Sequence, residues 1–376
     1  MKVKAAVLWE QGRPRPYAES RPMTIEEIDL DPPGPGEVLI EVGGAGLCHS
    51  DLSSIEGLRT RRLPTVPGHE GAGTIRAVGE GVRGLAVGDH VVTAFVASCG
   101  ECRYCNGGRP NICTGSAASR ADGTLLSGAR RMRLGGEPVH HYSGLSLFAQ
   151  YCVASASSAV KIDKDIPLAD AAIFGCAVLT GVGAALNTAR IHPGSSAAVV
   201  GLGGVGMNAL LGAVVAGAER IVAVDTNPDK LTLARELGAT DTFLAGNADV
   251  VQAIIEATHG GVEYAIETAG VAEAMNLAYA ITARGGTTVS AGLPAPNKLV
   301  SYPHAAMVSD EKTIKGSYMG SCLPQRDIPA YLALYKRGKL PVNRLLSGTI
   351  GLEEINAGFD RLTAGSVLRQ VLVPNG

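Results

Sequence analysis

The chain has 376 residues, of which 46% are hydrophobic and 18% charged, and its formal net charge is −2. A chain of this length predicts two domains and buries enough surface to stay folded without disulfide staples. The near-neutral charge lacks the basic excess typical of proteins that bind nucleic acid or anionic membranes, so we expect neither partner.

The N-terminal stretch reads MKVKAAVLWE and is predicted to form a strand. It has neither the long apolar run nor the cleavage site of a signal peptide. Farther along, the uncharged residues 197–218 are numerous enough to cross a bilayer, but their clustered glycines favour a buried strand, turn and helix. We therefore expect a cytoplasmic protein that does not enter the membrane, with its cysteines as thiols or thiolates rather than disulfides.

Up to about residue 177 the predicted elements are short strands. The runs EVLIEVGGAG, GAGTIRAVGEG and GDHVVTAFV are apolar and bounded by turn-forming residues. This pattern is typical of a β-barrel or sandwich with frequent turns. The polar and basic stretch from Thr114 to Gly144 is interpreted as a long loop or lobe over this β unit.

Four of the eight cysteines lie within residues 98–113, in SCGECRYCNGGRPNIC. Their spacing departs from that of a ferredoxin iron–sulfur cluster, which stays an alternative together with free thiols. Four thiolates on one short loop suit a tetrahedral zinc ion with no open position, which is a structural site. The predicted ligands are Cys99, Cys102, Cys105 and Cys113.

After about Leu179 strands alternate with helices. Predicted strands lie in SAAVVGLG, RIVAVD, GVEYAIETAG and RGGTTVSAGL, separated by helix patterns such as NPDKLTLARELGA. This alternation predicts an α/β fold with a parallel sheet covered on both faces. The alternation stops at about residue 321, and VLRQVLV near the C-terminus is one more strand, which could rejoin the first domain.

The first strand of this region runs into a glycine-rich turn, GLGGVG, at the start of a helix. In such a turn Gly201 permits the tight bend, Gly203 admits a pyrophosphate, and Gly206 lets helix and strand pack closely. Asp225 ends the next strand, near the spacing at which an acidic residue binds the ribose hydroxyls. Its charge would repel the extra phosphate of NADP, so the pattern favours NAD, with Lys230 as a further ribose contact. The predicted contacts in the turn are Gly201, Leu202, Gly203, Gly204, Val205 and Gly206.

Three further residues offer a second metal site. Cys48 lies in GLCHSDL, His69 in PGHEGAG and Cys176 in FGCAVLTG. Each alone is more typical of a core residue, but together two thiolates and one imidazole form a zinc ligand set whose fourth position is free for water or substrate. Asp51 and Glu70 are candidates for orienting His69 or modulating the metal, or they are surface charges beside turns.

The order and spacing of these motifs resemble those of the zinc-dependent alcohol dehydrogenases of the medium-chain dehydrogenase/reductase superfamily. The motifs are GLCHSDL, PGHEGAG, the four clustered cysteines, FGCAVLTG, and GLGGVG with Asp225. The resemblance covers nearly the whole chain. It implies a GroES-like β-barrel catalytic domain over residues 1–177, and a Rossmann domain with a doubly wound parallel sheet over 178–320. A C-terminal segment, 321–376, would return to the catalytic domain. NAD and two zinc ions per chain are the implied cofactors, with an alcohol and its aldehyde or ketone as substrates and a homodimer or homotetramer as the assembly.

The resemblance also assigns roles to individual residues. It places a catalytic zinc on Cys48, His69 and Cys176, with Glu70 beside it, and a structural zinc on the four clustered cysteines. Ser50 matches the hydroxyl that passes the alcohol proton onward. The remaining matches are Thr180 near the nicotinamide, Arg369 at the coenzyme pyrophosphate, and Phe95 and Tyr142 in the substrate channel.

Two departures from the family pattern bear on the exit of the proton and on the strength of coenzyme binding. Ser53 stands where the family often ends its proton relay in a histidine, and His49 stands where some members carry a pyrophosphate-binding arginine.

Two rival functions stay open. A thiol-dependent formaldehyde dehydrogenase would share the metal and coenzyme residues, and Arg130, Arg131 and Arg133 are candidates for the cationic groups that its substrate needs. A rival of another class is a non-catalytic redox sensor that binds NAD or an iron–sulfur cluster. A zinc-free quinone reductase is disfavoured, because both sets of zinc ligands are present.

Overall fold

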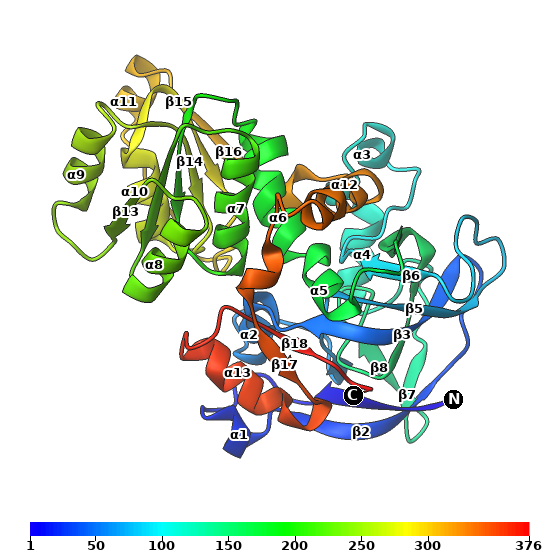
Figure 1. Ribbon diagram of the computed structural model, residues 1–376. Helices are drawn as coiled ribbons and strands as arrows, with labels where there is room; N and C mark the ends of the chain where they lie inside the picture. The colour runs from blue at the N-terminus through cyan, green and yellow to red at the C-terminus, as the bar shows by residue number, and fades with distance from the viewer. Residues whose placement is uncertain (376) are drawn as a thin grey trace. The chain divides into compact units, whose positions relative to one another are not determined.

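The computed structural model describes residues 1–375, which divide into two compact units (Figure 1). The first unit contains residues 1–176, 323–333 and the chain from 342 onward, and the second contains residues 177–322 and 334–341. A closed β-barrel lies in the first unit and a parallel sheet in the second, which confirms the predicted α/β class with a barrel and a Rossmann-type sheet.

Five short strands of the first unit close into a barrel in the order β1-β2-β7-β8-β4. β1 pairs with β2 in antiparallel fashion over its whole length. Their inward side chains, among them Val7 and Ile28, are fully buried in the core of this unit. The strands are β1 (Lys2–Leu8), β2 (Met23–Leu30), β4 (Thr65–Val66), β7 (Met132–Leu134) and β8 (Glu137–His141).

The stretch from Thr114 to Gly144, predicted to be a loop, instead carries regular structure. It contains the helix α4 (Thr114–Asp122) and the hairpin β7–β8, which completes the barrel. Gly135 and Gly136 form the hairpin turn with φ angles of 59° and 89°, in the left-handed region that favours glycine. The loop prediction is wrong because the two strands are short and only half of their residues are apolar, although a Gly-Gly pair between them is a recognised hairpin signal.

A second sheet of the first unit has the order β10-β6-β5-β3-β18-β17, and β9 also pairs with β3. The end of β3 runs antiparallel to β18, with Ala45 opposite Leu372. This pairing brings Arg369, the first residue of β18, next to Leu47, which directly follows β3. The strands are β3 (Glu37–Gly46), β5 (Gly71–Val78), β6 (His90–Thr93), β9 (Tyr151–Ser155), β10 (Ala159–Ile162), β17 (Leu346–Ile350) and β18 (Arg369–Leu372).

The helices of the first unit are short, and most of them connect two strands along the chain. One of them, α2, begins directly after Cys48, and α12 has residues in both units. The helices are α1 (Tyr17–Ser20), α2 (His49–Ile55), α3 (Arg103–Asn106), α4 (Thr114–Asp122), α5 (Leu168–Ala172), α12 (Pro324–Lys336) and α13 (Ile355–Thr363).

The second unit is a six-stranded sheet in the order β13-β12-β11-β14-β15-β16, in which all neighbouring strands are parallel. Counted from β11, this is the order 3-2-1-4-5-6 of a Rossmann fold. Figure 1 shows the sheet flanked by helices. Its strands are β11 (Ser196–Val200), β12 (Arg220–Asp225), β13 (Asp241–Leu244), β14 (Val262–Glu267), β15 (Thr282–Ser290) and β16 (Thr313–Gly316), and its helices are α6 (Ala177–Gly183), α7 (Gly204–Val215), α8 (Pro228–Glu236), α9 (Val250–Ala257), α10 (Ala272–Ala280) and α11 (His304–Ser309).

The uncharged residues 197–218 fold as predicted, into the strand β11, a turn and the helix α7. Within residues 1–375, no single helix has both the length and the apolar character needed to cross a membrane. One bent pair of helices, at residues 168–175 and 177–189, passes the same test of length and composition when taken together.

Candidate active site and metal centres

Four side chains from distant parts of the first unit form the group that we call the buried cluster: Cys48, His69, Glu70 and Cys176. One possible ligand atom from each lies within 4.8 Å of every other, and all four residues are buried. Two sulfurs and one imidazole match the three-ligand set of a catalytic zinc site, in which the fourth position stays open. Sequence reasoning predicted this group, and the structure brings its members together.

Local structure positions each of these side chains. Cys48 is the N-cap residue of α2, and His69 follows β4 at the end of a buried Pro-Gly turn. Cys176 directly follows a 3-10 turn, Ile173–Gly175. The turn packs tightly against β6, because a Cβ added at Gly175 would lie 2.1 Å from the carbonyl oxygen of Thr93. The donor positions are therefore set by packed backbone rather than by free loops.

Asp51, one turn into α2, orients the imidazole of His69. Its Oδ1 lies 2.9 Å from His69 Nδ1 and also accepts a hydrogen bond from the backbone N–H of Gly68. With Nδ1 held by a carboxylate, Nε2 is the nitrogen left to bind a metal. Burial opposes a charge on this imidazole, but the Asp51 carboxylate outweighs it and raises the pKa of His69 well above its ordinary value. The same carboxylate would stabilise a zinc ion bound at Nε2, which would take the place of the proton.

The two thiols of the buried cluster differ in acidity. A hydrogen bond from Cys176 holds the pKa of Cys48 well below its ordinary value, and the same contact together with burial raises the pKa of Cys176. Cys48 therefore favours its thiolate form although it is buried. Thiolates are the form in which cysteine binds zinc.

Glu70 and Arg369 form an ion pair behind the cysteines. Arg369 Nη2 lies 3.5 Å from Glu70 Oε2, and Arg369 Nη1 donates to the carbonyl oxygen of Leu47 at 2.9 Å. Neither carboxylate oxygen of Glu70 has a hydrogen-bond partner, and burial raises the pKa of Glu70 to about 8. The contact of Arg369 with a coenzyme pyrophosphate stays a prediction.

Two hydroxyl groups of α2, those of Ser53 and Ser54, have different hydrogen-bond partners. The hydroxyls of Ser54 and Tyr142 lie 2.8 Å apart, and Tyr142 also donates to the carbonyl oxygen of Ser50 at 3.1 Å. Ser53, in contrast, donates to the backbone oxygen of His49 at 2.9 Å. Sequence reasoning missed Ser54, although its place one helical turn after Ser50 puts it on the same face of α2.

Two aromatic rings predicted to lie in the substrate channel are found beside His69. The ring of Phe95 meets the imidazole edge-on, with centroids 5.5 Å apart, and the ring of Tyr142 lies 6.0 Å away at a tilt of 45°. Tyr142 is buried and Phe95 is partly exposed. Burial, followed by the charge of Asp51, raises the pKa of Tyr142, so its hydroxyl stays protonated.

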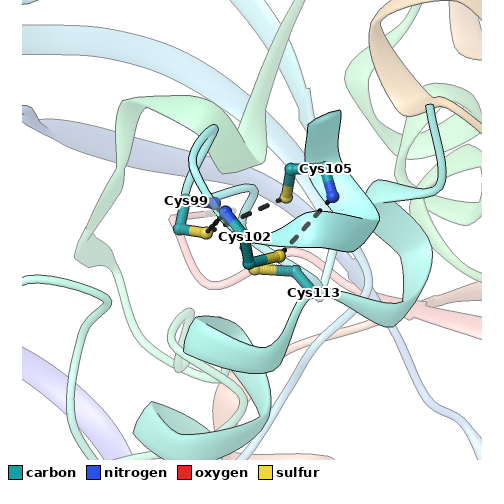
Figure 2. A group of neighbouring side chains, drawn as sticks. All are labelled: Cys99, Cys102, Cys105 and Cys113. Carbon is teal, nitrogen blue, oxygen red and sulfur yellow. Dashed lines mark hydrogen bonds between the residues drawn. The ribbon is translucent and has the colours of Figure 1, made fainter. Parts of the chain in front are cut away.

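The four clustered cysteines form a second group, which we call the cysteine lobe (Figure 2). One sulfur from each lies within 4.8 Å of every other, and the sulfurs of Cys99 and Cys105 are 3.9 Å apart. This is far beyond a disulfide bond, and all eight cysteines are free. Zinc–sulfur bonds of about 2.3 Å in a tetrahedron place sulfurs about 3.8 Å apart, so the group fits a closed zinc site.

Backbone N–H groups support the sulfurs of the cysteine lobe. The N–H groups of Cys102, Cys105 and Ser116 point at the sulfurs of Cys99, Cys102 and Cys113, at 3.4, 3.5 and 3.4 Å. The bond from Cys105 lowers the pKa of Cys102 to about 5, while burial raises that of Cys113 to about 11. Such N–H···S bonds favour thiolates, the ligand form that zinc needs.

The glycine-rich turn of the second unit has the geometry that a dinucleotide needs. Gly201 has a φ of 92°, and a Cβ at Gly206 would lie 1.8 Å from the oxygen of Gly201, so both positions require glycine. A Cβ at Gly203 would meet nothing within 4 Å, which leaves open space beside the start of α7. Free N–H groups at a helix start bind phosphate. The other predicted contacts are the buried Leu202 and the first two residues of α7, Gly204 and Val205.

Asp225, at the end of β12, is tied to this turn. One of its oxygens accepts a hydrogen bond from the N–H of Leu202 at 2.5 Å and the other from the N–H of Asn227 at 2.9 Å. Lys230 Nζ lies 4.0 Å from the same carboxylate. Of the other predicted coenzyme contacts, Thr180 lies buried in α6 and His49 is exposed at the start of α2.

The barrel, the Rossmann-type sheet and the two groups of metal-binding side chains define a zinc-binding oxidoreductase class, and comparisons with known proteins agree. Family models described as "Alcohol dehydrogenase GroES-like domain" and "Zinc-binding dehydrogenase" match residues 34–164 and 204–337. Over 99% of its length and 100% of the relative's, the chain is 40% identical to "Putative alcohol dehydrogenase D" of Mycobacterium tuberculosis.

Two solved structures are similar over the full chain. A crystal structure of an alcohol dehydrogenase zinc-binding domain protein from Burkholderia ambifaria has a TM-score of 0.94 and 36% identity, with 100% of both chains covered. Benzyl alcohol dehydrogenase from Acinetobacter calcoaceticus has a TM-score of 0.92 and 32% identity, with 100% of this chain and 99% of that chain covered. The chain therefore belongs to the zinc-binding alcohol dehydrogenases of the medium-chain dehydrogenase/reductase superfamily.

Proposed function

We propose that this protein is a zinc- and NAD-dependent alcohol dehydrogenase that interconverts an alcohol and its aldehyde or ketone by hydride transfer. The observation that carries the proposal is the meeting of Cys48, His69 and Cys176, with their ligand atoms within 4.8 Å of one another in a buried site. When bound, zinc supplies a Lewis acid that makes an alcohol hydroxyl easier to deprotonate and polarises a carbonyl in the reverse reaction.

The surrounding residues would prepare the site for this chemistry. Asp51 fixes the ring of His69 so that Nε2 faces the two sulfurs. Arg369 offsets negative charge beside Cys48 and Glu70, which lowers the cost of holding thiolates away from water. Ser50 would accept the proton that the alcohol loses and pass it onward. The predicted metal roles are a catalytic zinc in the buried cluster and a structural zinc in the cysteine lobe.

NAD is the proposed coenzyme because of Asp225. Its carboxylate is held at the end of β12, within hydrogen-bond distance of the glycine-rich turn, where the ribose hydroxyls of a dinucleotide would lie. A fixed negative charge there opposes the additional phosphate of NADP. Lys230 is close enough to Asp225 to contact the same ribose.

The hypothesis of a thiol-dependent formaldehyde dehydrogenase is weaker, because it depended on three arginines that would bind the substrate. The three arginines proposed for its substrate are engaged elsewhere in the first unit. Arg131 pairs with the buried Glu37 at 2.8 Å. The other two contacts are Arg130 with His140 and Arg133 with Asp31.

The test is metal analysis combined with turnover. We expect close to two zinc ions and no iron per chain, and reduction of NAD in the presence of primary alcohols, with benzyl alcohol as the first probe because of the Acinetobacter relative. Iron in place of zinc without turnover would support the redox-sensor alternative. Formaldehyde oxidation only in the presence of a low-molecular-weight thiol would support the thiol-dependent formaldehyde dehydrogenase.

The coenzyme assignment has a separate test. We expect Asp225→Gly to narrow the preference for NAD over NADP by roughly 10- to 100-fold in kcat/KM, because the repelling charge is removed. Lys230→Gln is the matched control, since it leaves that charge in place. An unchanged ratio of the two kcat/KM values in Asp225→Gly would show that this carboxylate does not discriminate between the coenzymes.

The proposed assembly follows from the family resemblance, and the proposed location is the expectation drawn from the sequence. We propose a cytoplasmic homodimer or homotetramer. Sedimentation equilibrium of the purified chain would distinguish these from a monomer.

A further inference from the structure

The loop that follows α2 carries three arginines, Arg59, Arg61 and Arg62, and Arg61 lies against Tyr142. The guanidinium of Arg61 lies over the ring of Tyr142, with its central carbon 4.7 Å from the ring centroid. Its Nε donates to the hydroxyl of Ser54 at 3.4 Å. Arg61 is half-buried, so this positive charge lies partly out of water against an aromatic face.

Tyr142 connects this cation to the proposed zinc site. The same ring that carries Arg61 lies 6.0 Å from the imidazole of His69. Its hydroxyl is fixed by Ser54 and by the backbone oxygen of Ser50. Arg61 and His69, a proposed metal ligand, therefore lie against the same aromatic ring.

Arg61 has no acidic partner within residues 1–375. Within these residues its guanidinium makes one hydrogen bond, to Ser54, and one cation–π contact, with Tyr142. Its neighbour Arg62 instead faces Asp122 at 3.8 Å. A guanidinium has five N–H donors, and a half-buried one without an anion leaves most of them to be satisfied by a ligand or by water.

The backbone of Arg61 is held by Gln11, which lies three residues after the end of β1. The side-chain oxygen of Gln11 accepts a hydrogen bond from the N–H of Arg61 at 3.2 Å, and its nitrogen donates to the carbonyl oxygen of Arg59 at 2.8 Å. A second bond from the same nitrogen reaches the carbonyl oxygen of Ser54. The loop is thus clamped to the barrel, and the cation is pre-organised rather than free on a flexible segment.

We propose that Arg61 determines substrate specificity, and that the enzyme prefers alcohols and aldehydes that carry a carboxylate at the end remote from the reacting carbon. This proposal rests on the proposed function. A planar guanidinium pairs with a carboxylate through two parallel hydrogen bonds, while the reacting end of the same molecule would lie at the metal, past the edge of the Tyr142 ring. Arg61 takes no part in hydride or proton transfer, so it selects the substrate without being a catalytic residue.

The test compares two substrates of nearly the same shape, 4-(hydroxymethyl)benzoate and 4-(hydroxymethyl)benzamide. With the native holoenzyme we expect kcat/KM to be roughly 10- to 100-fold higher for the benzoate, as for a charge-assisted hydrogen bond made in one case only. Arg61→Gln should abolish this preference, mainly through KM for the benzoate, and should change kcat/KM for the benzamide by less than about threefold. Arg61→Lys should restore part of the preference, and Arg61→Glu should reverse it.

Arg62→Gln is the matched control, because it removes an adjacent exposed arginine that already faces Asp122. Equal losses for both substrates in Arg61→Gln would assign this arginine a structural role and overturn the proposal. A rise in the KM for NAD with both substrates would show that Arg61 acts on coenzyme binding, and this result would also overturn the proposal. Turnover of other primary alcohols but not of the benzoate would also overturn the proposal, whereas lack of turnover with any primary alcohol would contradict the proposed function, so the two failures are distinguishable.

Discussion

The buried cluster and the cysteine lobe offer metal ligands in opposite ways. The lobe takes four sulfurs from one short segment, and three of its four residues are partly exposed. The buried cluster takes two sulfurs and one imidazole from three distant parts of the chain, and every member is buried. Both groups are compact enough for one ion, but only the buried set leaves a coordination position for substrate.

The difference shows how a fold separates stability from reactivity. A closed set of four thiolates holds its own segment together, so its ion would act on folding. An open set must be held by the rest of the molecule, and here Asp51 and Arg369 do this from α2 and β18. The following variants are ordered from the largest expected effect to the smallest, and each tests one side of this contrast.

Cys48→Ala removes one ligand of the proposed catalytic zinc. We expect kcat to fall by at least roughly 1000-fold, because the Lewis acid is lost or misplaced. NAD affinity, measured by fluorescence titration, should change by less than about twofold, since the glycine-rich turn lies in the second unit. Cys152→Ala, at a buried cysteine outside both groups, is the control and should keep its turnover. Native turnover in Cys48→Ala would contradict the proposed role of the buried cluster.

Cys102→Ala removes one ligand of the cysteine lobe. We expect the loss of one zinc ion per chain, a thermal midpoint lowered by roughly 5 to 10 °C, and proteolysis within residues 98–122, because the ion stabilises this segment. The kcat of the chains that stay folded should change by less than about threefold. Glu101→Gln, in the same lobe but not at a ligand, should behave as native. A large loss of kcat with unchanged thermal stability would show that the lobe is catalytic.

Asp51→Asn weakens the support of one ligand without removing it. Because the amide keeps the shape but not the charge, we expect kcat/KM to fall by roughly 10- to 100-fold and zinc to dissociate faster from the buried cluster only. Asp51→Glu should recover part of the activity. The readout is kcat/KM together with zinc loss to a chelator over time. If both zinc ions leave at the native rates, Asp51 has no role in holding the imidazole.

We expect His141 to contribute to the acid sensitivity of the barrel, separately from any loss of metal by protonation of its ligands. Its Nε2 accepts the N–H of Arg131. Burial lowers its pKa to about 3, with Glu37 opposing this effect and Arg131, Arg130 and His140 adding to it. The neutral imidazole therefore contributes stability above pH 6.5, which is lost as the pH falls towards 3. The upper limit is roughly 5 kcal/mol.

The corresponding measurement is the urea midpoint of native protein and His141→Gln at pH 7.5 and pH 5. Glutamine keeps an acceptor for the N–H of Arg131 but does not titrate, so we expect the variant to lose less stability between the two pH values. His192→Gln, at an exposed histidine, is the control and should follow the native protein. An equal loss in native protein and His141→Gln would attribute the acid sensitivity to other groups.

Much of the fold could be predicted from local patterns. The strand, glycine-rich turn and helix at residues 196–215 are found where the apolar run and the glycines predict them. The same holds for α8. Its N-cap residue is Asn227, whose side-chain oxygen accepts a hydrogen bond from the N–H of Asp229. The hairpin β7–β8 was missed, because its two strands are short and pair with strands of the barrel that lie far away in the chain.

The candidate site could be predicted in part. The motifs around Cys48, His69 and Cys176 gave the ligands, and Asp51 was a candidate to orient His69. Nothing in the local sequence marked Arg61 as a cation over Tyr142, because the two residues are far apart in the chain and meet only through the folded first unit.

The sequence by itself determined the features that neighbouring residues build together: the four sulfurs of the cysteine lobe, the glycine-rich turn, and the alternation that forms the parallel sheet. Tertiary structure alone decided which distant groups face one another. The pairing of β18 with β3 set Arg369 beside Glu70, and the clamp of Gln11 set Arg61 over Tyr142. The physical reason is that backbone geometry acts over a few residues, whereas contacts between distant segments depend on the packing of the whole unit.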